Sequence, residues 1–330
     1  MLAKNKRKII SIALIALLCI FFGITTDSFF VTRNIIQLLR QAAYTGLIAC
    51  GMCYVMVGGG IDLSAGGAMC LVGVIAARVA FVGLPGVIVL IIGIAFGAFL
   101  GMLNGLIVTK LHLTEFVTTL ASGTAFSGLA LLTIFRERGR VISVTLTKDS
   151  FNFFGKPVGK IYWMTIAWVI ATVIMHIIMT RTKFGLHVMA MGSASKSAEM
   201  SGVNITFVKI MTFVIAGTMA GLASTLLVAY QTGTNQNVGN MMEFNAIAAC
   251  VVGGVMMEGG KGDPICAMLG SIFMTLITNG LYKMGLTTGG TYLLQGLVIL
   301  IAMAFDGQFA RLSARKRKIA AVSDGKGGES

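Results

Sequence analysis

Long apolar runs separated by short polar intervals constrain this chain more than any other feature of its sequence. Many of them approach the roughly 20 residues that an α-helix needs to cross the hydrocarbon core of a bilayer. The candidate spans are 9–24, 35–57, 66–83, 86–108, 116–134, 161–179, 210–229, 243–256, 265–281 and 290–305. The sequence therefore predicts an all-α fold, a polytopic membrane helix bundle of about ten transmembrane helices.

The composition supports this class of protein. Hydrophobic residues make up 56% of the chain and charged residues only 12%, whereas a soluble domain carries about 25% charged residues. The net charge of +14 does not indicate nucleic-acid binding, because the basic clusters at 4–8 and 315–318 flank apolar runs. Such clusters set the topology and attract anionic lipid headgroups. We expect one transmembrane domain over 1–330, with short cytoplasmic tails at 1–8 and 306–330.

The distribution of positive charge predicts the topology. Ten spans place both ends of the chain on one side of the membrane. If that side is the cytoplasm, most of the 26 Lys and Arg residues are cytoplasmic, as the positive-inside rule requires. We therefore predict a multi-pass protein of the cell (inner) membrane with both termini cytoplasmic. The exceptions are Arg136, Arg138 and Arg140 in the loop 135–160; either one span is miscounted, or these arginines have a partner outside.

Two glycine clusters interrupt the apolar pattern, at 58–67 and 253–264. Glycine permits sharp, non-helical backbone, which survives at membrane depth only where protein or a cavity surrounds it. A carboxylate at the centre of a span costs about 2.5–3.5 kcal/mol, so Asp62 lies either at a boundary or at a functional point. We expect it to accept hydrogen bonds from freed backbone amides. The residues assigned to these structural helix breaks are Gly59, Gly60, Asp62, Ser64, Gly253 and Gly254.

Glycines also recur inside the apolar runs, where they predict close helix packing. Gly93, Gly97 and Gly101 follow one another at every fourth position, and Gly217 and Gly221 repeat that spacing. Small residues on one face allow two backbones to approach closely in a membrane.

A long polar interval at 181–209 separates two apolar runs. Its basic residues place it in the cytoplasm. Ser193 or Ser195 can cap a short helix that runs to about Ser201, and Gly202 can end it. Such a helix gives a soluble partner a rigid element to push on; the alternative is a simple connecting loop.

Polar, uncharged side chains suggest a solute pathway. Gln37, Gln41 and Tyr44 lie on one face of a helix at i, i+4 and i+7, and Asn245 begins a later span. Amides beside an aromatic ring suit ligands rich in hydroxyl groups. The alternative is that these residues only form hydrogen bonds between helices, which contribute about 0.6 kcal/mol each.

Motifs for catalysis and for metal or nucleotide binding do not occur. No glycine–lysine pair has the spacing of a phosphate-binding loop, so the chain does not bind ATP by that route and energy must come from a partner. The three histidines lack metal-ligand spacing, no catalytic nucleophile motif is found, and the six cysteines all lie in apolar runs. We expect no enzyme activity, no bound cofactor and no metal.

Four segments resemble the permease subunits of ribose-type sugar ABC importers. Two of them carry the glycine clusters: GGGIDLSAGG at 58–67, and EFNAIAACVVGG at 243–254 followed by EGGKG at 258–262. The third is GMLNGL at 101–106 followed by FVTTL at 116–120. The fourth is the cytoplasmic interval, in which Gly192 precedes AEMSGVN at 198–204.

The resemblance implies that the chain is the permease subunit of an ATP-driven importer of a monosaccharide or related carbohydrate. It implies a second permease copy or a paralogue, cytosolic ATPase subunits that bind the ATP, and an extracytoplasmic sugar-binding protein. The arginines of loop 135–160 would then dock that binding protein. The residues assigned to the ATPase-coupling loop are Gly192, Ala198, Glu199, Ser201 and Gly202.

A self-sufficient ion-coupled secondary transporter is the alternative function. Such transporters also use broken helices, but they usually need ionisable residues in mid-span. Only Asp62 and Glu243 come close to that position.

The topology is tested with reporter fusions at Lys148 and at Arg317. We expect the two reporters to lie on opposite sides of the membrane, because an odd number of predicted spans separates them. A reporter on the same side at both positions would contradict the ten-span topology.

Overall fold

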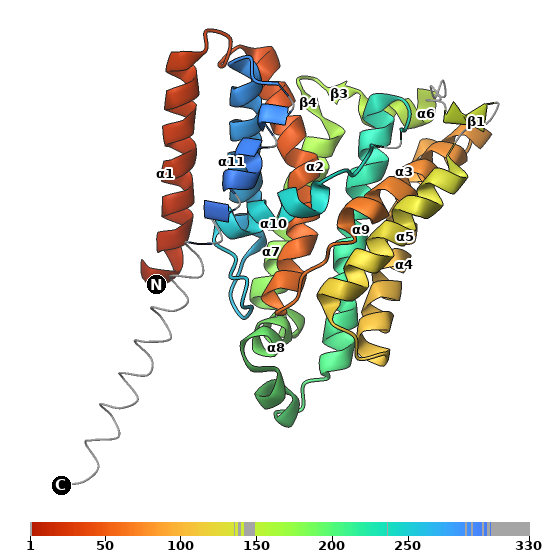
Figure 1. The fold of residues 1–330 in the computed structure, drawn as a ribbon, viewed down its shortest axis with the longest axis vertical. Coiled ribbons are helices and arrows are strands. Elements are labelled where there is room, and N and C mark those ends of the chain that lie inside the picture. Colours follow the sequence, from red (N-terminus) through yellow and green to blue (C-terminus); the bar gives the residue numbers. More distant parts are fainter. Residues whose placement is uncertain are drawn as a thin grey trace.

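The computed structural model describes residues 2–134, 136–137, 140–141, 149–235, 237–287, 289–291, 293–298, 300–301 and 304. Long helices lie side by side and form a bundle (Figure 1). The helices are α1 (Leu2–Thr25), α2 (Thr32–Val57), α3 (Ala65–Val82), α4 (Gly86–Lys110), α5 (Glu115–Thr133), α6 (Asp149–Asn152), η1 (Phe153–Gly155), α7 (Trp163–Arg181), α8 (Lys183–Met200), α9 (Ile205–Gln231), α10 (Met242–Gly253) and α11 (Pro264–Lys283). Two small antiparallel pairs join β1 (Arg136–Glu137) to β2 (Arg140–Val141) and β3 (Pro157–Val158) to β4 (Ile161–Tyr162).

Seven helices of the described part are long and apolar enough to cross a membrane, so the predicted count of about ten is not confirmed. They are α1, α3, α4, α5, α7, α9 and α11. The predicted span 243–256 is wrong, because α10 has 12 residues and is about 18 Å long, which is less than the roughly 30 Å of the hydrocarbon core. The predicted span 290–305 is only partly inside the described residues.

Helix α2 is the centre of the bundle. It has 26 residues but is more polar than the seven helices named above. Every residue from Thr45 to Val57 is buried. It packs against α7, α9, α10 and α11. Because protein rather than lipid surrounds it, α2 can carry the polar side chains that a lipid-facing helix excludes.

Helices α4 and α9 pack through their glycines, as the sequence predicts. A Cβ atom added at Gly97 would lie 2.3 Å from the carbonyl oxygen of Gly217, and one at Gly217 would lie 2.2 Å from the carbonyl oxygen of Gly97. The two backbones are therefore in direct contact, and any side chain would separate them.

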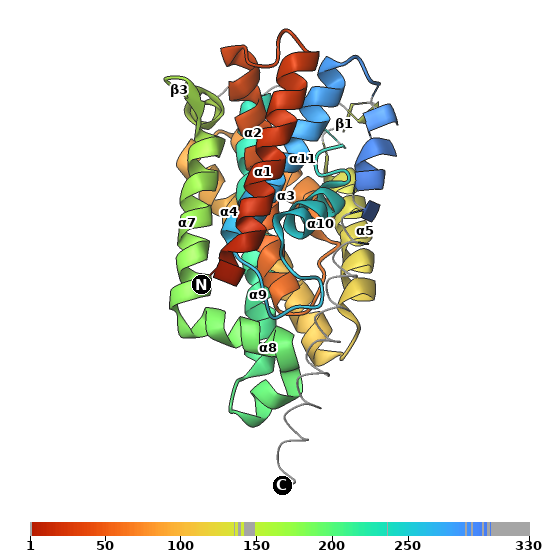
Figure 2. The same ribbon diagram turned by 90° about the vertical axis from the view of Figure 1, so that its left-hand side faces the viewer.

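The two ends of the bundle differ. Helix α8 lies at the end where α7 finishes and α9 begins, whereas the short strands, α6 and η1 lie at the opposite end (Figures 1 and 2). The described parts of the loop 135–160 and the interval 181–209 therefore lie at opposite ends. Helix α1 begins at Leu2, so residues 2–8 of the segment predicted as a tail at 1–8 are helical; the tail 306–330 lies outside the described residues.

Replacing Gly217 with Val tests the α4–α9 contact. We expect the free energy of unfolding to fall by about 1–3 kcal/mol, because the new side chain overlaps the backbone of α4. Thermal unfolding in detergent measures the change. Gly128→Val is the matched control, because nothing lies within 4 Å of a Cβ atom at that helical position. Equal melting temperatures for the two variants would contradict the packing.

Candidate functional site

Three segments that are distant in sequence meet at the C-terminal end of α2, where their backbones are in direct contact. We call this contact the glycine junction, formed by Gly59, Gly192, Gly259 and Gly260. The amide of Gly260 donates to the carbonyl oxygen of Val57 over 2.8 Å. A Cβ atom at Gly192 would lie 1.9 Å from that same oxygen, and one at Gly259 would lie 2.8 Å from Cα of Gly59 and 2.9 Å from the oxygen of Gly192. The first break, the second break and α8 therefore touch at one point.

Backbone conformation also requires glycine here. The φ angles are +87° at Gly59, +85° at Gly259 and +75° at Gly260. Residues with a Cβ atom rarely adopt these values. The junction thus depends on glycine for its turns as well as for its close contacts.

Asp62 braces the first break. Its Oδ1 accepts hydrogen bonds from the Ser64 amide at 2.8 Å and from the Ser64 hydroxyl at 2.5 Å, so the predicted bond from a freed backbone amide is present. Ser64 Oγ in turn accepts from Asn104 Nδ2 at 2.6 Å, which ties the break to α4. Asp62 is 3% exposed, so these bonds replace its contact with water.

The other predicted break residues also have defined places. Gly60 lies against α5, because a Cβ atom there would overlap the Glu115 carboxylate, which forms an ion pair with Lys209 over 2.5 Å. Gly253 ends α10 against the carbonyl of Cys266, and Gly254 has a φ of +96°. The sequence analysis did not single out Glu115, because no local pattern marks its contact with the break.

Asp263 anchors the end of the second break. Its Oδ1 accepts from the Ile265 amide at 3.0 Å and caps α11, while Lys8 Nζ lies 2.5 Å from Oδ2 and His176 Nδ1 lies 2.6 Å from Oδ1. Burial raises the pKa of this carboxyl, but the bonds from Lys8, the Ile265 amide and His176 outweigh that effect and hold the pKa below its ordinary value. Asp263 therefore stays ionised and joins α1, α7 and α11.

Helix α8 consists of two helical segments that meet at a kink. The first begins at Lys183, where the Thr182 hydroxyl caps it by accepting from the Gly185 amide at 3.3 Å, and the sequence analysis did not predict it. The backbone leaves the helical conformation at Ala194, where φ is −162° and ψ is 82°, and the short segment that follows is the predicted short helix. The predicted C-terminal end of the short helix is confirmed, because Gly202 follows α8 with a φ of +85°.

The residues predicted for the ATPase-coupling loop differ in their exposure to solvent. Glu199, Ser201 and Gly202 are exposed, whereas Gly192 lies in the glycine junction. Ala198 is only 6% exposed and packs within the chain, and its contact with a partner stays a prediction. Met200 is 85% exposed and was not assigned to the coupling loop.

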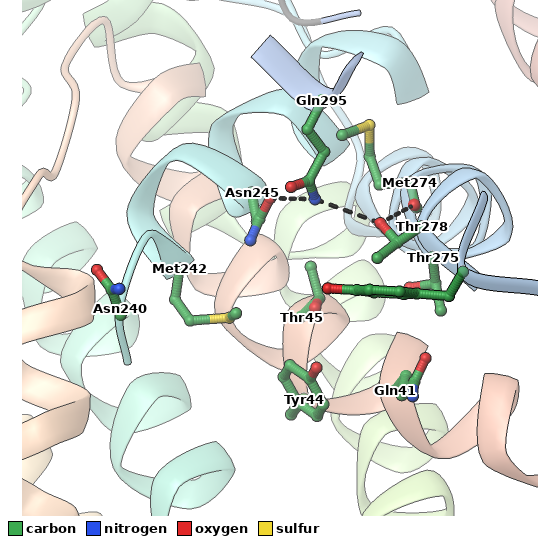
Figure 3. Close-up of a pocket in the computed structure, with 11 residues that line it drawn as sticks. Gln41, Tyr44, Thr45, Asn240, Met242, Asn245, Met274, Thr275, Thr278 and Gln295 are labelled. Carbon is green, nitrogen blue, oxygen red and sulfur yellow. Dashed lines mark hydrogen bonds between the residues drawn. The ribbon is translucent and has the colours of Figure 1, made fainter. Parts of the chain in front are cut away.

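Two adjoining cavities lie beside the first half of α2. The first has a volume of about 190 Å³ and the second of about 380 Å³, and they share Gln41, Tyr44, Asn240 and Met242. Figure 3 shows the first, with Gln41, Tyr44 and Thr45 facing Asn245 and Gln295 across it. Of the predicted pathway residues, Gln41, Tyr44 and Asn245 line these cavities and Gln37 does not. The sequence analysis missed Asn240, Thr45, Thr275, Thr278, Tyr282 and Gln295.

The second cavity contains a buried cation. Arg40 is 9% exposed, and its guanidinium carbon lies 3.9 Å from the ring centroid of Tyr230 and 5.9 Å from that of Tyr162. The faces of these rings stabilise the charge by cation–π interaction. Arg40 therefore ties α2 to the end of α9 and to β4, and the sequence analysis gave it no role.

Two of the predicted docking arginines, Arg136 and Arg140, have their backbones in the paired strands β1 and β2, at the end of the bundle opposite α8. Their side chains, and Arg138, lie outside the described residues. Docking at this loop stays a prediction.

Metal ligands do not gather in the described part of the chain. No group of three or more His, Cys, Asp or Glu side chains there could hold a metal ion. The six cysteines are free thiols, five of them buried.

The fold, with its broken helices and polar cavities, has the features of a membrane transport subunit. The family model described as "Branched-chain amino acid transport system / permease component" matches residues 34–303. The chain belongs to this family of transport-system permeases, so it is a translocating subunit and not a catalytic one.

Curated relatives narrow the comparison to sugar permeases. The ribose import permease protein RbsC of Bacillus subtilis (strain 168) is 36% identical over 296 residues, which cover 88% of this chain and 89% of that protein. The D-allose transport system permease protein AlsC of Escherichia coli (strain K12) is 30% identical over 291 residues, or 88% of each chain. The resemblance to ribose-type sugar permeases is thus confirmed. No solved structure matches the chain.

Substitution of Asp62 tests the brace. Both bonds from Ser64 end on Oδ1, so the carbonyl oxygen of Asn can accept both. We expect Asp62→Asn to lower stability by about 1 kcal/mol and to retain partial transport, because a neutral acceptor is weaker than a carboxylate. Asp62→Leu leaves the Ser64 donors unpaired and should lose about 3 kcal/mol, assembly and transport. Co-purification and uptake measure both effects. If Asn behaved like Leu, the charge itself would be essential.

Proposed function

We propose that the chain is the transmembrane permease subunit of an ATP-driven importer of a monosaccharide or related carbohydrate. It receives the solute from an extracytoplasmic binding protein and pairs with a second permease copy or a paralogue. Cytosolic ATPase subunits bind the ATP and act on α8. Both termini face the cytoplasm, and loop 135–160 faces the binding protein.

The glycine junction is the observation that carries this proposal. Helix α8 is exposed at Glu199 and Met200, where a soluble partner can reach it. Seven residues before Glu199, at Gly192, its backbone touches Val57 and Gly260, at the two helix breaks. No side chain intervenes, so a displacement of α8 moves both breaks directly. Packed backbone of this kind responds as a rigid body, because interiors are close-packed and barely compressible.

The cavities support a carbohydrate as the solute. Their lining is rich in amides and hydroxyl groups, which both donate to and accept from sugar hydroxyls. Two of the relatives are named for the import of ribose and for the transport of D-allose. Loop 135–160 carries positive charge at the end opposite α8 (Figure 1), where complementarity with an acidic binding protein would raise the association rate.

The ion-coupled alternative finds no support at either candidate carboxylate. Asp62 is bonded to Ser64 inside the first break. Glu243 lies against the first turn of α3, because a Cβ atom at Gly66 would approach its Oε2 to 2.1 Å. The family and its sugar-importing relatives favour the ATP-driven function.

Two substitutions in α8 test the coupling. Gly192→Ala places a methyl group 1.9 Å from the Val57 oxygen and 2.6 Å from the Gly260 nitrogen, so it must disrupt the hydrogen bond between them. We expect normal insertion, ATPase assembly and a loss of at least tenfold in transport. Ser195→Ala, at an exposed position of the same helix, is the matched control and should transport normally.

The partner contact is tested with a cysteine at Met200. We expect Met200→Cys to crosslink to the ATPase in membranes, because this side chain is 85% exposed beside the kinked end of α8. Absence of a crosslink, together with normal transport by Gly192→Ala, would show that α8 is only a connector.

A further inference from the structure

Two threonines at the first cavity differ from most helical threonines of this protein. Thr109, Thr218 and Thr278 each donate to the carbonyl one turn earlier, over 2.6–3.0 Å. Thr45 and Thr275 line the cavity and are only 7% and 6% exposed, and no hydrogen bond joins either hydroxyl to a described residue. Neither hydroxyl oxygen is fully buried, so both open into the cavity, where each can donate to and accept from a ligand.

Three amides at the same cavity also have unused bonding groups. Gln295 Nε2 donates to Asn245 Oδ1 at 2.9 Å and to Thr278 Oγ1 at 3.3 Å, as Figure 3 shows. These bonds use both hydrogens of Gln295 Nε2. They fix the two amides so that Gln295 Oε1 and Asn245 Nδ2 have no partner among the described residues. The amide of Gln41, on the other side of the cavity, has none either.

Together these groups form a ring of donors and acceptors around one cavity. We propose that the first cavity is a binding site of the permease itself for one uncharged monosaccharide ring. Gln41, Thr45, Thr275, Asn245 and Gln295 bind its hydroxyl groups. This inference rests on the proposed function and adds to it a site that holds the sugar between the binding protein and the cytoplasmic exit.

Charge and size define the class of ligand. None of the described residues that line the first cavity carries a charge, whereas a carboxylate or phosphate group is usually bound by Arg or Lys. The volume of about 190 Å³ is that of a small site, since pockets for drug-sized ligands hold roughly 300–1,000 Å³. The site therefore favours a neutral pentose or hexose over a disaccharide or a sugar acid.

The position of the site on α10 links it to the movement of the second break during transport. Asn245 lies in the first turns of α10, and the other end of α10 leads through Gly254 into the second break. Movement of that break shifts α10 as a unit and changes the distance between Asn245 and Gln295. The site is therefore intact in the arrangement seen here and opens when α8 moves.

Transport by the reconstituted importer tests the site. We expect Thr45→Val and Thr275→Val each to lower the sugar imported per ATP hydrolysed about fivefold, because a hydrogen bond contributes about 1 kcal/mol and 1.4 kcal/mol is a factor of ten. Stimulation of the ATPase by the loaded binding protein should not change. Thr218→Val, which removes a hydroxyl bonded to its own helix away from the cavity, is the matched control.

Protection from modification tests binding directly. Thr275→Cys, in a Cys19→Ser background, is treated with a small alkylating reagent in the presence of D-ribose, D-allose, sucrose or D-gluconate. We expect at least one of the two neutral monosaccharides to slow the reaction, and sucrose and D-gluconate to have no effect. Lys160→Cys, at an exposed position at the same end of the bundle, is the control. Its rate of alkylation should be the same in the presence of each of the four compounds.

The outcomes separate this inference from the proposed function. If the complete importer transports a sugar but the threonine variants import it as efficiently as the wild type, and no monosaccharide protects position 275, the site does not exist. If the wild-type importer transports no sugar at all, the proposed function itself fails.

Discussion

Direct contact between backbones at the glycine junction is the constraint on which the rest of the structure depends. Gly192 of α8 lies against Val57 and Gly260, and Gly259 lies against Gly59, at distances that a single methyl group would prevent. The turns on either side need positive φ angles as well. Each break is then braced from a different direction, the first through Asp62 and Ser64 to α4, and the second through Asp263 to α1 and α7.

The short length of α10 follows from the same arrangement. Helix α10 extends only from Met242 to Gly253, where the second break ends it. Its last residue is in contact with the Cys266 carbonyl, and its first turns carry Met242 and Asn245 into the cavities. One end of α10 is thus connected to α8 through the junction, and the other end faces the solute. A rigid half-helix is a direct way to transmit a cytoplasmic displacement to a polar site inside the bundle.

The sequence predicted those features of the fold that depend on local patterns of residues. Apolar runs and their flanking charges indicated a membrane bundle, glycine spacing predicted the α4–α9 contact, and glycine clusters located both breaks. The short helical segment after Ala194 was predicted, but the segment before it, which Thr182 caps, was taken as part of the polar interval. The meeting of Gly192 with Gly260, the Glu115–Lys209 pair and the Asn245–Gln295 bond join positions far apart in sequence, and no periodicity reports such contacts. The burial of Ala198 likewise depends on tertiary packing, which the local sequence does not report.

The central claim is that α8 and the second break move as one body. Pulsed electron paramagnetic resonance between spin labels at Ser195→Cys in α8 and Glu258→Cys in the break measures this directly, because both positions are exposed. The importer is compared without nucleotide and with ATP bound. The account predicts that the distance between these two labels stays constant, while the distance from each of them to a label at Leu84→Cys, in the α3–α4 turn, changes. A change in the Ser195–Glu258 distance while the Glu258–Leu84 distance stays fixed would contradict it.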